Sequence, residues 1–367
     1  MIPIAEPCLG DEELKNVVDA VKSGWISSKG EFIEEFEGGF ARYCGVKYGI
    51  ASSNGTVALH LALKALGIDK GNEVMVPDLT FIATANAVTY CNAKPVFVDS
   101  HPEYWCIDPE KMEENITPNT KAIIPVHVYG HPCDMDAIID IAEDHGLYVI
   151  EDAAEAHGAE YKGRKVGSFG DVSCFSFYGN KIITTGEGGM CLTDNEELRE
   201  NMRALRDHAM SSNKRYWHDV IGFNYRMTNM QAAIGVAQLT KISKFIGKKR
   251  QIAGWYREGL EDLASHGLIT LHPEMSWAKC VYWMYSILVE DGFGINRDEL
   301  IRLLEKKGID TRPFFYPVHV LPPYKTDEDT LNIARTLSLK GLNLPSSPTL
   351  EKNEIEYIVE TCIKMIE

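Results

Sequence analysis

One lysine stands in a stretch of the sequence that is otherwise apolar or rich in glycine and threonine. Lys181 follows the strand-like run 172–177 and precedes the turn TTGEGG. A lysine that is desolvated in a pocket has a lowered pKa and becomes a nucleophile. The same side chain could instead cap its own loop or pair with Glu187, so this lysine alone does not define a reaction.

Two further features precede the lysine. Asp152 ends the apolar run 148–152, and a carboxylate at a buried strand end needs a cation or hydrogen-bond donors. The residues Asn54-Gly55-Thr56 open a helical stretch, where free N–H groups and the positive end of the helix dipole suit a phosphate. Each also has an ordinary structural explanation, as a turn cap for Asp152 and as an N-cap for the helix start.

In combination the three features indicate pyridoxal 5'-phosphate (PLP) as cofactor. The lysine would form a Schiff base with the aldehyde, the aspartate would keep the pyridine nitrogen protonated, and the helix start would bind the phosphate. Asp152 and Lys181 are 29 residues apart, which leaves room for one excursion and a return strand. At about 4 Å and an effective dielectric of about 20, an aspartate–pyridinium pair contributes about 4 kcal/mol.

These residues must be brought together by a sheet. Between residues 45 and 193 apolar runs alternate with amphipathic stretches, which predicts βαβ units in an α/β fold with a mostly parallel, seven-stranded sheet. Ligands of such sheets bind beyond the carboxyl ends of the strands, where all three features fall. The predicted strands are residues 48–52, 73–77, 95–99, 121–126, 148–152, 172–177 and 189–193.

The later part of the chain has a different pattern. A long helical stretch, from about residue 229 to 266, is expected to be broken or bent near its middle. Beyond it a strand and two helices alternate less regularly. We therefore predict a large α/β domain over residues 1–240 and a smaller C-terminal α+β domain over residues 241–367.

Composition excludes several classes of function. The net charge is −16, which argues against binding to the nucleic-acid backbone. We expect no membrane span and no signal peptide, because no apolar run is long enough and the first residues lack a basic region. The nine cysteines contain no CxxC pair, which is typical of a cytoplasmic protein with free thiols. His127 and His131 are spaced as in some zinc sites, but their segment reads as a strand end and a turn and not as a helix face with paired ligands, so we predict no metal site.

The chain resembles the DegT-type sugar aminotransferases, which are PLP enzymes of fold type I. The resemblance extends over essentially the whole length and rests on six motifs in order. They are SSNGTVALHLAL, VMVPDLTFIATANAV, VIEDAAEAHGA, FSFYGNKIITTGEGGM, GFNYRMTNMQAAIG and TRPFFYPVHVLPPY.

The resemblance implies a role for each matching residue. Lys181 would be the Schiff-base lysine and would also move the proton, and Asp152 would pair with the pyridine nitrogen. Glu155 would lie near the ring and Phe81 would stack on it. The cofactor phosphate would be bound by Gly55, Thr56 and Ser176, and by Asn224 from the neighbouring subunit of a homodimer.

The resemblance also implies the reaction. L-Glutamate would give its amino group to the C4 ketone of a nucleotide-linked 4-keto-6-deoxyhexose. The product would be used in the synthesis of a polysaccharide such as O-antigen. The motifs favour GDP-4-keto-6-deoxymannose as acceptor and GDP-perosamine as product. Three segments supply the expected substrate contacts, namely Trp25, Ser27, Ser28, Lys214, Arg215, Tyr216, Arg312, Tyr316 and His319.

Two alternatives remain open at this point. The same chemistry could act on a UDP- or dTDP-4-keto-6-deoxyhexose, because the catalytic residues would be unchanged. The chain could also be a non-catalytic binding or regulatory protein on an aminotransferase scaffold. Such a protein could dispense with the lysine or the aspartate, whereas this sequence retains both.

Overall fold

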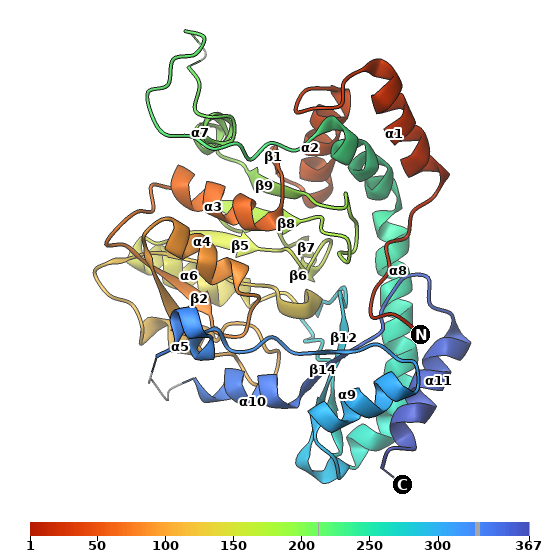
Figure 1. Cartoon of the computed structure of the whole chain (residues 1–367). Coiled ribbons are helices and arrows are strands. Elements are labelled where there is room, and N and C mark those ends of the chain that lie inside the picture. Colours follow the sequence, from red (N-terminus) through yellow and green to blue (C-terminus); the bar gives the residue numbers. More distant parts are fainter. Residues whose placement is uncertain (212, 327–330, 367) are drawn as a thin grey trace.

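The computed structural model describes residues 1–211, 213–326 and 331–366, and it is built around a seven-stranded sheet (Figure 1). The strand order is β1-β9-β8-β5-β4-β2-β3, and β9 is the one strand of this sheet that runs antiparallel to its neighbours. The mostly parallel α/β sheet predicted from the sequence is therefore confirmed. The strands are β1 (Tyr48–Ser52), β2 (Glu73–Pro77), β3 (Lys94–Val98), β4 (Thr120–Ile123), β5 (Tyr148–Asp152), β8 (Val172–Ser176) and β9 (Gly189–Thr193).

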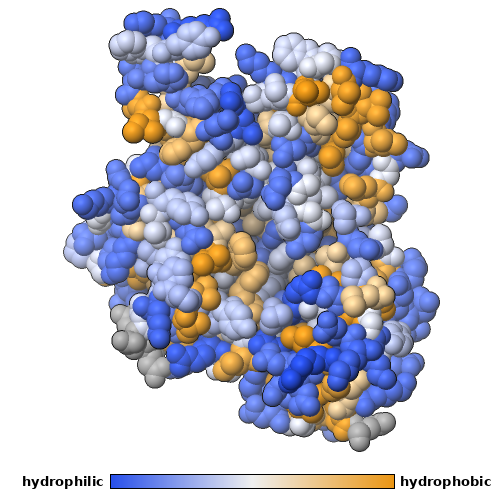
Figure 2. Space-filling model, in the orientation of Figure 1, coloured by the Kyte–Doolittle hydropathy of each residue, from blue (hydrophilic) through white to orange (hydrophobic). Residues whose placement is uncertain are grey.

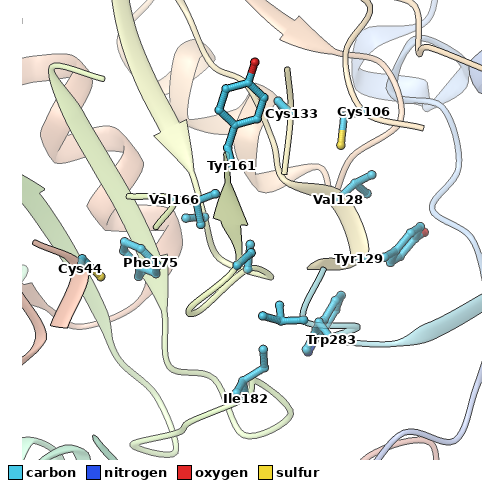
Figure 3. Close-up of a cluster of buried hydrophobic side chains, with 14 of the residues drawn as sticks. Cys44, Cys106, Val128, Tyr129, Cys133, Tyr161, Val166, Phe175, Ile182 and Trp283 are labelled. Atoms are coloured by element: carbon cyan, nitrogen blue, oxygen red, sulfur yellow. The ribbon is translucent and has the colours of Figure 1, made fainter. Parts of the chain in front are cut away.

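Helices cover both faces of this sheet because its strands are apolar on both sides. Val74 and Val76 belong to the core under one helical layer, together with Leu61, whereas Met75 between them belongs to the core under the other layer, which also contains Phe36. Figure 3 shows part of the core to which Met75 belongs. The first layer consists of α3 (Gly55–Ala65), α4 (Ala83–Tyr90) and α7 (Glu196–Arg206). The second consists of α2 (Glu31–Cys44), α6 (Met135–His145) and the first half of α8 (Asn229–Ser265).

Helix α8 (Asn229–Ser265) connects the two parts of the molecule. It is one continuous helix of 37 residues, so the prediction that it is broken near its middle is wrong, while the alternative of a bend stays a prediction. Its first half packs against α1 (Asp11–Ser23) and α2, and its second half packs against α11 (Lys352–Ile363). The change of partner explains why the apolar pattern changes along the helix while the backbone continues.

The C-terminal part is a four-stranded antiparallel sheet with its own core (Figure 1). The N-terminus also belongs to it, since the main chain of Ile2 is hydrogen-bonded to Gly308 and Asp310. The division at residues 240 and 241 stays a prediction, and it falls inside α8. The sheet comprises β10 (Ile269–Leu271), β12 (Tyr285–Val289), β13 (Arg312–Pro313) and β14 (Gly341–Leu344), with helices α9 (Arg297–Lys306), α10 (Asn332–Lys340) and α11.

Short elements complete the chain. A small sheet joins the two parts, because β11 (Ala278–Lys279) from the C-terminal part pairs with β6 (Glu160–Tyr161), which pairs with β7 (Arg164–Lys165). Helix α5 (Pro109–Glu113) lies between β3 and β4. No helix within the described residues has the length and apolar character that crossing a bilayer requires. The short 3-10 helices are Val128–Gly130, Asp291–Phe293, Val318–Val320 and Pro322–Tyr324.

Candidate active site

The predicted lysine and aspartate meet in one cavity of about 610 Å³ beyond the carboxyl ends of β5 and β8. Asp152 is the last residue of β5, and Lys181 follows β8 in the loop that leads to β9. The start of α3 forms another wall. The cavity is lined by seven of the eight predicted cofactor residues, namely Gly55, Thr56, Phe81, Asp152, Glu155, Ser176 and Lys181.

Asp152 is buried and is held by two donors. The hydroxyl of Thr84 donates to its Oδ2 at 2.8 Å, and the N–H of Ala154 donates to its Oδ1 at 3.2 Å. Burial raises the pKa of Asp152, whereas these hydrogen bonds and the charge of Lys181 oppose that rise. A cationic N–H in the cavity would complete the set of partners for this carboxylate, which is what a pyridinium nitrogen provides.

Lys181 is a largely buried amine that forms an ion pair with one carboxylate. Its Nζ lies 3.7 Å from Oε1 of Glu155 and 3.7 Å from the centroid of the Trp283 ring. Burial lowers the pKa of Lys181, while the charges of Glu155 and Asp152 act in the opposite direction. The position therefore favours a neutral, nucleophilic amine more than a surface position does.

Glu155 is the acidic group that lies beside the amine of Lys181. Burial raises its pKa to about 7, although the Lys181 ammonium and the N–H of Tyr129 favour its charged form. That N–H donates to Oε2 of Glu155 at 2.8 Å. The carboxyl group can thus hold or release a proton near neutral pH next to the reactive amine.

The start of α3 has the geometry of a phosphate cradle. Asn54 caps the helix by accepting from the N–H of Val57 at 3.0 Å, whereas the N–H groups of Gly55 and Thr56 have no partner within the helix. A Cβ at Gly55 would lie 2.7 Å from Cβ of Ser176, so only glycine allows the helix start to approach that serine. A lysine, a strand-end aspartate and this cradle in one cavity fit PLP.

The remaining predicted residues lie elsewhere. Asn224 is exposed, and its Oδ1 accepts from Nε of Arg226. The main-chain oxygens of Trp25 and Ser27 accept hydrogen bonds from Asn229. The described residues that line the Lys181 cavity include none of Trp25, Ser27, Ser28, Lys214, Arg215, Tyr216 or Asn224.

A second cavity of about 470 Å³ shares several walls with the first, among them Asn180 and Trp283. Arg312 and Tyr316 line it, as a substrate role would require. His319 lines neither cavity: it is buried, and its Nδ1 lies 2.6 Å from Oδ2 of Asp78. Its substrate role stays a prediction, and its contacts in this structure are structural.

Sequence reasoning missed three residues of the site. Thr84 supplies a hydrogen bond to Asp152, Trp283 covers Lys181, and Asn180 has a buried side-chain oxygen without a partner among the described residues. Asn180 directly precedes the lysine, so adjacency was an available signal. Trp283 carried no such signal, because it lies about a hundred residues from Lys181 in the chain.

The sequence profile of the DegT/DnrJ/EryC1/StrS aminotransferase family matches residues 7–363. The chain belongs to this family. It is therefore an aminotransferase, and its cofactor is PLP.

Individual relatives are similar over nearly their full length. The GDP-perosamine synthase of Caulobacter vibrioides is 49% identical over 359 residues, which are 98% of this chain and 96% of the relative. The GDP-perosamine synthase of Escherichia coli O157:H7 is 48% identical, with 98% and 97% covered. The crystal structure of an aminotransferase from Psychrobacter cryohalolentis superposes with a TM-score of 0.92 at 34% identity, covering 97% of this chain and 96% of that one.

Proposed function

We propose that this aminotransferase moves the amino group of L-glutamate to the C4 ketone of GDP-4-keto-6-deoxymannose, forming GDP-perosamine for polysaccharide synthesis. The observation that carries the chemistry is the meeting of Lys181, Asp152 and the α3 cradle in one cavity. The preferred sugar is supported by the 44–49% identity to GDP-perosamine synthases.

Each residue of the cavity has its own proposed role. PLP, when bound, supplies an aldehyde that accepts the amino group and a ring that stabilises negative charge. Asp152 would orient the ring and keep a proton on its nitrogen, and the start of α3 with Ser176 would hold the phosphate. Nζ of Lys181 would take and return the proton at the reacting carbon, and the Glu155 carboxylate beside it would favour the protonated amine.

A substrate panel tests the acceptor. The purified enzyme is given L-glutamate with GDP-4-keto-6-deoxymannose, or with a UDP- or dTDP-4-keto-6-deoxyhexose, and the aminated product is measured by mass spectrometry. We expect product from the GDP sugar and none from the Lys181→Ala variant. Product from only the UDP or dTDP sugar would make the acceptor wrong while leaving the reaction type intact. A protein that binds no PLP would instead support the non-catalytic alternative.

We further propose a homodimer in which Asn224 serves the cavity of the partner subunit. Asn224 is exposed and lies outside its own cavity, in a segment that follows the exposed residues Lys214 to Ile221. Apolar side chains also gather on the surface of α1 and of the segment that follows it, at the upper right of Figure 2. They are Leu14, Val18, Val21, Trp25 and Ile26. Such a surface is typical of a protein interface.

Complementation between subunits tests this arrangement. The Lys181→Ala and Asn224→Ala variants, each of low activity, are mixed under conditions that exchange subunits. If Asn224 acts across the interface, a mixed dimer contains one intact site, and about one quarter of the wild-type activity returns. No recovery in demonstrably mixed dimers would show that Asn224 acts within its own subunit or not at all.

The proposed location is the cytoplasm. All nine cysteines are free, and eight of them are buried. Unpaired thiols are typical of reducing compartments.

A further inference from the structure

A buried lysine in the middle of α8 has no role in the chemistry described so far. Lys249 is 3% exposed, and its Nζ donates to the main-chain oxygen of Trp283 at 3.0 Å and to that of Ser346 at 2.8 Å. Within the described residues no carboxylate forms an ion pair with it. Burial lowers its pKa to about 7. Burying a charged amine without a counter-charge costs folding free energy. The two hydrogen bonds of Lys249 to main-chain oxygens therefore call for a structural or functional reason.

The two acceptors belong to segments that leave the C-terminal sheet. Trp283 lies just before β12, and Ser346 lies just after β14. Ser346 is fixed further, because its hydroxyl accepts from the N–H of Tyr285 at 2.7 Å. An amine keeps at least two N–H groups in either protonation state, so Lys249 can satisfy both carbonyls throughout. Lys249 thus fixes the main chain of Trp283 relative to α8.

The side chain of Trp283 in turn contacts two residues of the active site, Lys181 and Asn180. Its ring centroid lies 3.7 Å from Nζ of Lys181, and its Nε1 donates to the main-chain oxygen of Asn180 at 2.9 Å. Figure 3 shows the ring beside that of Tyr129, and the two planes differ by 11°. The main chains of Gly130 and Trp283 approach each other closely, since a Cβ on Gly130 would lie 2.8 Å from the main-chain nitrogen of Trp283.

We propose that Lys249 is a positioning residue: by holding the main chain of Trp283, it keeps the indole ring against Lys181 and keeps water away from that amine. The inference rests on the proposed role of Lys181. The charged groups that face Lys181 are Asp152, at the end of β5, and Glu155, in the turn after it. The contacts of Lys249 do not involve them. Losing the ring contact would admit water, which solvates a protonated nitrogen.

The test compares Lys249→Met with Lys244→Met, the same substitution at an exposed position of the same helix. The readout is the pH at which the visible absorption of bound PLP changes, because that transition reports the proton on the Lys181 nitrogen. We expect the midpoint to rise by about one pH unit in Lys249→Met and to stay unchanged in Lys244→Met. An unchanged midpoint in a folded Lys249→Met protein, even one of lowered Tm, would overturn the proposal.

Two further variants complete the test. If Lys249→Met does not fold, Lys249→Gln replaces it, since its shorter amide keeps two N–H donors but cannot reach both carbonyls. In a Trp283→Leu background, Lys249→Met should add no further shift, because the ring through which it acts is gone. An equal additional shift there would refute action through Trp283. The absence of any visible absorption would refute the PLP site itself, which is a different outcome.

Discussion

The buried amine of Lys249 should make the stability of the protein depend on pH in a calculable way. The pKa of this group is about 7 in the folded chain, against 10.5 for an ordinary lysine. Between these values the unfolded chain binds more protons than the folded chain, so stability rises with pH. Below pH 7 the full penalty for charging the buried amine is present, and above pH 10.5 it disappears.

The size of the effect follows from these two values. Each pH unit of difference corresponds to about 1.4 kcal/mol, so Lys249 costs about 4 kcal/mol of folding stability at pH 7 and about 2 kcal/mol at pH 9. Lys249→Met removes this dependence. It also leaves the carbonyls of Trp283 and Ser346 without their donor, at a cost of about 1–3 kcal/mol each that does not vary with pH.

The assay is denaturant unfolding of wild type, Lys249→Met and Lys244→Met, followed by circular dichroism at about pH 7, 8 and 9. Relative to Lys249→Met, the wild type should gain about 2 kcal/mol between pH 7 and pH 9. The difference between wild type and Lys244→Met should stay constant. A constant difference for Lys249→Met as well would show that the amine does not lose its proton in this interval, which would refute the reasoning from burial.

Further predictions concern the cofactor site. Lys181→Ala should abolish covalent retention of PLP after borohydride treatment, read by the mass of the intact protein, and reduce turnover by at least about 100-fold. Asp152→Asn should reduce turnover by up to about 1000-fold, since the charge pair that it removes is worth about 4 kcal/mol; unchanged turnover would exclude the pyridinium role. Thr84→Val removes the donor to Asp152 and should weaken PLP binding by about tenfold, measured by reconstitution of the PLP-free protein. Gly55→Ala should weaken PLP binding more than Gly247→Ala, because the added methyl group meets Ser176 at position 55 and open space at position 247 on the exposed side of α8.

The parallel sheet was predictable because its strands are buried on both faces and therefore read as apolar runs. The predicted bounds 48–52, 73–77 and 148–152 coincide with β1, β2 and β5. Helix α8 was not predictable to the same degree. Its apolar residues face different partners in its two halves, and a change of partner has the same sequence pattern as a break.

The cofactor end of the site was predictable for the same reason that the sheet was. Parallel strands deliver Asp152 and Ser176 to one edge, and the order of strands along the chain suffices to bring Lys181 there. Trp283 reaches the lysine from the other part of the molecule, across an interface that no local pattern encodes. The covering of the amine therefore depends on how α8 and the C-terminal sheet meet, and Lys249 lies at that junction. A substitution far from the cofactor in sequence should thus change the proton affinity of Lys181 while Asp152 and the phosphate cradle keep their geometry.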